Sequence, residues 1–139
     1  MAHWLVKSEP SAWSWDQQVK AGAKGTHWDG VKNHTAKLNL MKMKKGDEVF
    51  FYHSNEGLAV VGICEIAKEH YPDPKAKPGE PWVVVDVKAK KKLPKPVTMQ
   101  EIKAEPKLSN MTLVKLSRLS VQPVSEDEWK IVCRMAGVK

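Results

Sequence analysis

The sequence predicts a single α+β domain over residues 1–139, with a curled mixed sheet or a small open β-barrel flanked by helices. The length of 139 residues is typical of one domain and is sufficient to bury a hydrophobic core. Hydrophobic residues make up 42% of the chain and charged residues 28%, which is typical of globular proteins. The predicted elements run strand, helix, helix, then mostly strands, then a helix. Because helices do not alternate regularly with strands, the pattern favours the α+β class.

The first third of the chain predicts one strand and two helices. The run HWLVK, residues 3–7, predicts the first strand. Ser14 begins a capping-box pattern, which predicts a short helix that the glycines of AGAKG end. Asn33 is expected to be the N-cap of a second helix through Met43, because the apolar residues after it recur at helical spacing. Between the two helices, THWDGVKN shows no clear period and predicts a loop.

The middle of the chain predicts a hairpin and a third strand. The runs EVFFYHS and LAVVGICEIA are dense in β-branched and aromatic residues and are separated by NEG, which predicts two central strands joined by a turn. The segment HYPDPKAKPGEP holds several of the prolines and predicts a loop. The run WVVVDVKA then predicts a strand that ends in Lys90–Lys92.

The last third predicts two capped helices and a final strand. Thr98 and Ser125 each begin a capping-box pattern. The run SRLSVQPV predicts the strand between those helices, and Pro123 ends it. Asp47 and Asp86 are expected at turns or on the surface. Three of the tryptophans fit core positions of these elements: Trp4, Trp15 and Trp129.

The chain is strongly basic, with a formal net charge of +7. All but two of its 23 basic residues, Arg118 and Arg134, are lysines. A lysine-rich surface holds phosphates as point charges and gives little base-specific readout. Two interpretations stay open, a solvated surface and a polyanionic partner. The Lys90–Lys92 run has the same two interpretations, as a guard of a sheet edge or as a phosphate track.

Common motifs of cofactor and metal chemistry are absent from the sequence. There is no glycine-rich nucleotide-binding motif, no P-loop, no nucleophile elbow and no metal-ligand spacing of His and Cys. Cys64 and Cys133 lie in apolar runs and are predicted to be buried free thiols in a reducing compartment. No apolar run has the length of a membrane span, and no signal peptide is recognised. We therefore expect no metal, no cofactor and no membrane partner, and a location in the cytoplasm, or in the nucleus of a eukaryote.

Polar and aromatic residues gather where the predicted strands end. Sites are commonly built at strand ends and in the loops that follow them. If these ends converge, they form a pocket with an aromatic wall and several hydrogen-bonding groups. The candidates for such a pocket are Lys7, Ser8, Glu9, Trp28, Asp29, Asn33, Tyr52, His53, Ser54, Arg118, Ser120 and Gln122.

Several longer strings resemble the EVE domain family. They cover nearly the whole chain in order: HWLVKSEP, WDGVKNHTAKLNL, GDEVFFYHS, VVGICEI, YPDP and LSRLSVQPVSEDEW. The resemblance implies a PUA-like fold related to the YTH domains, and binding of modified bases in nucleic acid, such as 5-methylcytosine. The family has Arg where this chain has Lys32, which removes a planar fork of donors from that position.

The resemblance also implies roles for individual residues. By similarity with the YTH pattern, Lys7 and Ser8 lie at the floor of the base pocket. Trp28 forms one wall of the pocket, and Asp29 is a neighbouring polar contact. A second wall is expected from one of three residues: Tyr52, Trp82 or Leu119.

The leading hypothesis is a monomeric, non-enzymatic reader that accepts a flipped base, while lysines hold the nucleic-acid backbone. Stacking on an aromatic face contributes roughly 1–3 kcal/mol per base, and extruding a base from a duplex costs a few kcal/mol. Stacking alone therefore barely balances extrusion. Hydrogen bonds to the base edge are also needed, and they are expected from Ser8, Asp29, Asn33 and Ser54.

Other interpretations stay open at this point. A core position is the alternative for Trp28, and for Asn33 the role of helix cap stands beside the pocket role, since both can hold together. An ASCH-like amidohydrolase acting on modified nucleosides is the first functional alternative, with Lys7 and Glu9 as an acid and base on one strand face. His53 and Ser54 are adjacent in a strand, so they point to opposite faces and do not form a base–nucleophile pair. The last alternative is an adaptor that binds a small molecule.

Overall fold

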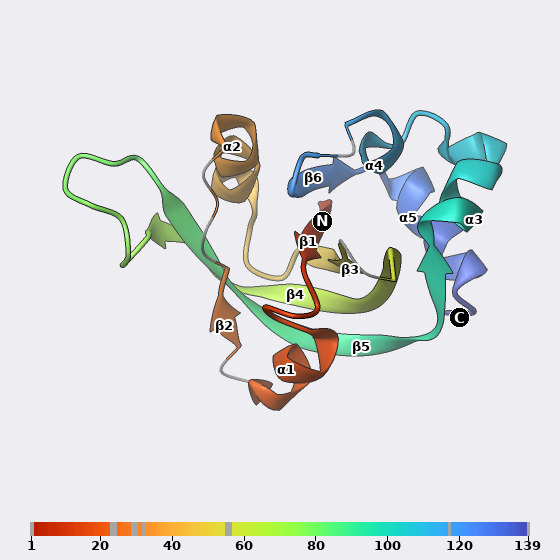
Figure 1. Ribbon diagram of the computed structural model, residues 1–139, viewed down its shortest axis with the longest axis horizontal. Helices are drawn as coiled ribbons and strands as arrows, with labels where there is room; N and C mark the ends of the chain where they lie inside the picture. Colours follow the sequence, from red (N-terminus) through yellow and green to blue (C-terminus); the bar gives the residue numbers. More distant parts are fainter. Residues whose placement is uncertain are drawn as a thin grey trace.

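The computed structural model describes residues 2–22, 25–28, 31, 33–54, 57–116 and 118–138. In these ranges six strands form one sheet in the order β2-β5-β4-β3-β1-β6 (Figure 1). The strands are β1 (His3–Ser8), β2 (Thr26–His27), β3 (Glu48–His53), β4 (Ala59–Pro72), β5 (Val83–Thr98) and β6 (Val121–Val124). The helical elements are α1 (Trp15–Lys20), α2 (His34–Lys42), α3 (Met99–Ala104), the 3-10 turn η2 (Pro106–Leu108), α4 (Thr112–Lys115) and α5 (Glu126–Met135).

The sheet is mixed. β1 runs parallel to β3, whereas the other neighbouring strands are antiparallel. The long strands β4 and β5 curve, and the sheet curls without closing into a barrel (Figure 1). The predicted α+β class is confirmed, and of the two predicted forms of the sheet the open, curled one is present.

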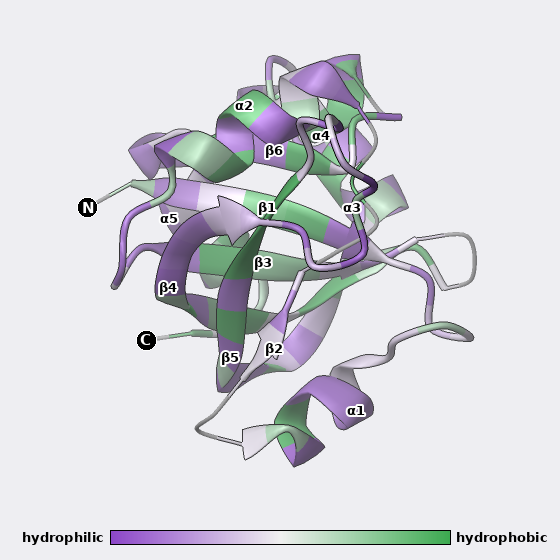
Figure 2. Ribbon diagram, turned by 90° about the vertical axis from the view of Figure 1, so that its left-hand side faces the viewer, coloured by the Kyte–Doolittle hydropathy of each residue, from purple (hydrophilic) through white to green (hydrophobic). Residues whose placement is uncertain are grey.

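Each face of the sheet has its own hydrophobic core. Because neighbouring side chains of a strand point to opposite faces, Phe51 packs with α1 and α2, and Phe50 packs under α3 to α5. Figure 1 shows α3, α4 and α5 grouped together, away from α1 and α2. In Figure 2 the central strand β3 is largely hydrophobic, and β1 is hydrophobic in its middle. The prediction that the run EVFFYHS is apolar on both faces is confirmed.

Local hydrogen bonds begin the helices where the sequence indicates. The reciprocal capping boxes of Ser14, Thr98 and Ser125 are all present, at α1, α3 and α5. Asn33 caps α2, since its Oδ1 accepts from the backbone nitrogen of Ala36 at 2.9 Å. The helices η2 and α4 were not predicted. They lie in the segment after α3, where no capping pattern comparable to the other three marks their start.

Several strand predictions need correction. β4 runs on to Pro72, into the segment predicted as a loop, and β6 (Val121–Val124) is shorter than the predicted run and includes Pro123, which was expected to end it. Thr26–His27, placed in a loop, forms the short strand β2 against Val87 and Asp86 of β5. β5 itself does not end in Lys90–Lys92 but runs on to Thr98. Beyond the pairs Thr26–Val87 and His27–Asp86, the edge of β5 that faces away from β4 has no strand partner among the described residues. Pro94 and Pro96 are tolerated because they fall in the irregularity between the pairs Gly62–Lys92 and Val60–Val97, where no ladder hydrogen bond is required of them.

Asp47 is buried, contrary to the expectation of a turn or surface position. Only 5% of it is exposed, and its Oδ2 accepts from the indole nitrogen of Trp4 at 3.0 Å and from the backbone nitrogen of Lys44 at 3.0 Å. A buried carboxylate is stable only when such donors replace water. Asp86 is half-buried, and its carboxylate accepts from the hydroxyl of Tyr71.

Trp15 fixes α1 directly on the sheet. Its ring lies against Gly62 of β4, where an added Cβ would come within 2.4 Å of the ring. Trp15 is buried, as are Trp4 and Trp129, so the predicted core positions of these three tryptophans are confirmed. α1 begins with Trp15, so the contact of Trp15 with β4 fixes one end of the turn between β1 and α1. β1, a strand of the sheet, fixes the other end.

Candidate functional site

A cavity of about 410 Å³ lies beside the end of β1. Its volume is within the range of typical ligand sites, about 300–1,000 Å³. We call it the aromatic cavity, because two tryptophans border it. The residues that line it are Lys7, Ala12, Trp13, Thr26, His27, Trp28 and Lys75.

Trp13 is a rigidly held wall of the aromatic cavity. Its backbone nitrogen donates to the carbonyl of Glu9 at 2.9 Å, and its own carbonyl accepts from the hydroxyl of Ser8. Its indole nitrogen donates to Oε1 of Gln18 at 2.9 Å. Gln18 is fully buried and donates in turn to the carbonyl of Val87 at 3.2 Å. The ring is therefore positioned before any ligand arrives, which reduces the entropy lost on binding.

Trp28 serves both the core and the cavity. Its backbone nitrogen donates to the carbonyl of Val85 at 2.7 Å, which continues the contact that β2 makes with β5. Its ring meets Phe51 edge to face, with centroids 5.6 Å apart. Only 8% of the residue is exposed, yet it borders the cavity. The two interpretations of Trp28, core and cavity wall, are thus both realised in part.

Lysines supply the charge at the aromatic cavity. Burial lowers the pKa of Lys7, whose ammonium lies 5.7 Å from the centroid of the Tyr52 ring. Lys75 reaches the same cavity from the loop between β4 and β5. The lining of the aromatic cavity therefore combines two tryptophans with two cationic side chains.

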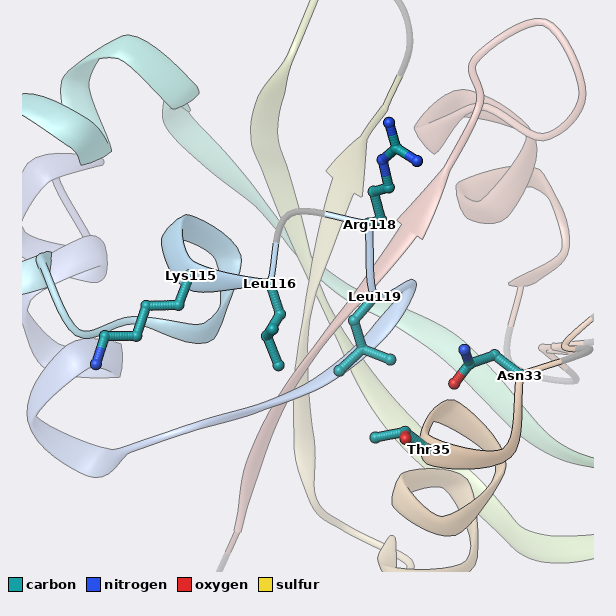
Figure 3. Close-up of a pocket in the computed structure, with 6 residues that line it drawn as sticks. All are labelled: Asn33, Thr35, Lys115, Leu116, Arg118 and Leu119. Atoms are coloured by element: carbon teal, nitrogen blue, oxygen red, sulfur yellow. The ribbon is translucent and has the colours of Figure 1, made fainter.

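A second cavity, of about 460 Å³, collects other residues predicted for the site. We call it the leucine cavity. In Figure 3 Leu119 and Thr35 point into the space between α2 and the segment before β6, whereas the guanidinium of Arg118 extends away from them. The sequence predicted one pocket. In the structure Lys7 and Trp28 line the aromatic cavity, Asn33, Arg118 and Leu119 line this second one, and the other described candidates line neither. The leucine cavity is lined by Asn33, Thr35, Lys115, Leu116, Arg118 and Leu119.

Gln122 holds the wall of the leucine cavity in place. It is fully buried, and its amide nitrogen donates to the carbonyls of Leu119 at 2.8 Å and Leu116 at 3.3 Å. Its Oε1 finds no donor among the described residues. Gln122 thus acts on the backbone of two lining residues and does not itself line the cavity.

The remaining predicted residues lie outside both cavities. Tyr52 is buried in the core with Phe50, where its ring centroid lies 5.7 Å from the ammonium of Lys7, and Glu9 is exposed. Trp82 packs on His34, with ring centroids 5.1 Å apart. Backbone groups of two predicted residues support the end of β1: the nitrogen of Ser54 donates to Ser8, and the carbonyl of Ser120 accepts from Lys7, each at 2.9 Å. Asp29 and Lys32 lie outside the described residues.

His53 is part of the framework of the aromatic cavity. Its Nε2 accepts from the backbone nitrogen of Trp15, the first residue of α1, at 3.1 Å. Burial lowers the pKa of His53, and Asp16 opposes this shift. The neutral imidazole is therefore favoured, since a protonated ring could not accept this hydrogen bond.

This arrangement predicts a loss of stability in mild acid. Folded His53 has a lowered pKa, so its contribution is complete above the ordinary pKa of about 6.5 and is lost as the pH falls through the lowered value. We expect the free energy of unfolding to fall as the pH drops below about 6.5 and through the lowered pKa of His53, and to fall less in His53→Gln, which keeps an acceptor that does not titrate. Urea denaturation of both proteins at each pH measures the difference. Equal slopes in the two proteins would contradict the assignment.

A curled mixed sheet flanked by helices, with a tryptophan-lined cavity at the end of its first strand, defines a small domain of the α+β class. The chain belongs to the EVE domain family, whose model matches residues 2–135. It is 33% identical to thymocyte nuclear protein 1 of Homo sapiens, an alignment that covers 94% of this chain and 72% of the relative. Family membership confirms the resemblance seen in the sequence.

Solved structures of relatives share the fold over almost their full length. A Rhodopseudomonas palustris protein is 59% identical with a TM-score of 0.94, over 99% of this chain and 94% of the other. The human THYN1 protein, solved in complex with DNA that contains 5-methylcytosine, is 33% identical with a TM-score of 0.89, over 98% of each chain. A YTH domain of Zygosaccharomyces rouxii is 16% identical with a TM-score of 0.58, over 97% of this chain and 86% of that domain, which shows a shared fold alone.

Neither a metal-binding cluster nor a membrane-spanning helix is present among the described residues. These residues contain no group of three or more His, Cys, Asp or Glu side chains arranged to hold a metal ion. No helix in the same ranges is long and apolar enough to cross a membrane. Both cysteines are free, as predicted. Cys64 is buried and Cys133 half-buried, and burial raises the pKa of each thiol, to about 11 for Cys133.

Proposed function

We propose that this domain binds nucleic acid and takes up a modified base of the 5-methylcytosine type in the aromatic cavity, between Trp13 and Trp28. The observation that carries the proposal is the pair of tryptophans at one cavity in a chain whose human relative was solved with DNA containing 5-methylcytosine. Trp13 offers the partly exposed ring on which a base stacks. Trp28 closes the cavity from the core side.

Stacking and phosphate contacts are both needed to offset the free energy of extruding a base. Stacking contributes roughly 1–3 kcal/mol, and extrusion from a duplex costs a few kcal/mol, less from a single strand. One buried methyl group adds about 0.8 kcal/mol, which corresponds to roughly fourfold discrimination. We assign the balance to phosphate contacts of Lys7 and Lys75, two lysines that line the cavity. The net charge of +7 supports the same mode of binding.

Fluorescence anisotropy with matched oligonucleotides tests the proposal. We expect a single strand with one 5-methylcytosine to bind about fourfold more tightly than the same strand with cytosine. Affinity for both strands should fall steeply between about 50 and 200 mM salt, because counterions are released on binding. Equal affinity for the two strands would count against recognition of the modification, and affinity without salt dependence would count against nucleic acid as the ligand.

The geometry does not favour the hydrolase alternative. Lys7 lines the aromatic cavity, but Glu9 is exposed and is not among the lining residues, so the two do not form an acid–base pair there. Incubation with acylated cytidines separates the two functions, since a reader binds them without turnover. A small-molecule adaptor would bind its ligand with little salt dependence. The monomeric state and the cytoplasmic or nuclear location stay predictions.

A further inference from the structure

The leucine cavity has the chemistry of a second nucleotide site. Leu116 is 57% exposed although it is a large apolar residue, and Leu119 is half-buried against the core. Lys115 and Arg118 are cationic lining residues whose side chains extend outward from the two leucines in Figure 3, and the described lining residues include no acidic side chain. An apolar floor with a cationic rim fits a ligand that has a flat apolar body and an anionic group, as a nucleotide has.

The leucine cavity also adjoins the proposed base site. The backbone nitrogen of Lys7, which borders the aromatic cavity, donates to the carbonyl of Ser120 at 2.9 Å. Ser120 directly follows Leu119 in the chain. On the far side of the cavity, the side chain of Asn39 in α2 donates to the carbonyl of Val121 at 2.8 Å and joins that helix to β6. The two cavities therefore flank the same end of β1, with their connecting backbone fixed.

The wall of the leucine cavity is positioned in advance. The buried amide of Gln122 holds the carbonyls of Leu116 and Leu119, and Asn33 caps the helix that carries Thr35. The volume of the leucine cavity, about 460 Å³, is close to the 410 Å³ of the aromatic cavity. A cavity of that size accommodates a second nucleotide unit.

We propose that the leucine cavity binds the nucleotide next to the captured base on the same strand. This inference rests on the proposed function and adds a second point of contact to it. The base and sugar of the neighbouring nucleotide cover Leu116 and Leu119. Its phosphate lies toward the rim, near Lys115 and Arg118. The domain then reads two consecutive units of a strand, one in each cavity.

Leu116→Glu tests the proposal, with Leu38→Glu as its matched control. Leu38 is 51% exposed on α2 and lines neither cavity, so the control makes the same change of charge and size on an equally open surface. The probes are 5-methyldeoxycytidine monophosphate and a trinucleotide with 5-methylcytosine at its centre, followed by NMR titration. We expect Leu116→Glu to weaken trinucleotide binding about tenfold and to leave mononucleotide binding unchanged. Leu38→Glu should match the unmodified protein with both probes.

Each other outcome overturns the inference in a recognisable way. Equal loss in both variants would show an effect of net charge and not of the cavity. Equal loss of mononucleotide and trinucleotide binding in Leu116→Glu would show damage to the aromatic cavity. Unchanged trinucleotide binding would assign the leucine cavity to another class of ligand, such as a peptide. Failure of the unmodified protein to bind either probe would instead reject the proposed function itself.

Discussion

Replacing Trp13 by alanine is expected to lower the affinity for a strand with a modified base by roughly 10- to 100-fold. The substitution removes the partly exposed ring of the aromatic cavity. It also leaves Oε1 of the buried Gln18 without its indole donor, so a modest loss of stability, about 1–2 kcal/mol, accompanies the loss of binding. Anisotropy measures the first effect and thermal unfolding the second.

Two further variants make the test of Trp13 specific. Trp13→Phe keeps a flat ring without the indole nitrogen and should retain most of the affinity. Trp82→Ala removes another half-buried tryptophan, one that lies outside both cavities and was a sequence candidate for the second wall. Affinity lost in Trp82→Ala but kept in Trp13→Ala would place the second wall at Trp82 and reject the present assignment.

Trp28 is a less informative target than Trp13. Its ring packs on Phe51 and is almost fully buried. Truncation of a buried tryptophan to alanine costs about 3–5 kcal/mol, so lost binding would not be separable from lost folding. The half-exposed ring of Trp13 avoids this difficulty.

Asp47→Ala is expected to lower the free energy of unfolding by about 3 kcal/mol, because each buried donor left without a partner costs about 1–3 kcal/mol. The carboxylate accepts from the Trp4 indole and from the backbone nitrogens of Lys44 and Ala2, the last at 3.2 Å. These bonds join the start of β1 to the turn before β3. Urea denaturation measures the loss, which corresponds to a fall in melting temperature of roughly 10 °C for a chain of this length.

Two controls separate this network from a general effect of losing a carboxylate. Asp47→Asn keeps one oxygen acceptor and should lose less stability than Asp47→Ala. Asp127→Ala removes an exposed carboxylate in the first turn of α5 and should cost less than about 1 kcal/mol. A loss in Asp47→Ala no larger than that in Asp127→Ala would contradict the structural role of Asp47.

Local signals in the sequence predicted the helices well, because their cause is local. A capping box needs only four consecutive residues, so Ser14, Thr98 and Ser125 identified three helix starts. The strands of the central hairpin were equally clear from their composition. The length of β5 was underestimated, because a lysine run followed by two prolines is typical of a loop. Such a run fits a strand only where one edge of the strand has no strand partner, and the sequence does not show which edge is unpaired.

The site was predicted only in part, because its geometry depends on contacts between distant residues. Lys7 and Trp28 were found from their places at strand ends and in the family pattern. Trp13 was missed, since its position depends on Gln18, which is anchored to Val87, 69 residues along the chain. The one signal available was its place directly before a capped helix that follows the first strand. Likewise, nothing local shows that the indole of Trp4 meets Asp47.

The open outer side of β5 has a consequence for protein engineering. That stretch carries Lys90, Lys91 and Lys92, all exposed, followed by the exposed Pro94 and Pro96. Charge and proline at such a position prevent the strand from pairing with another molecule. Variants in which lysines are neutralised to reduce non-specific binding should therefore keep these three. Their loss would lower non-specific binding but would promote aggregation through the unpaired strand edge.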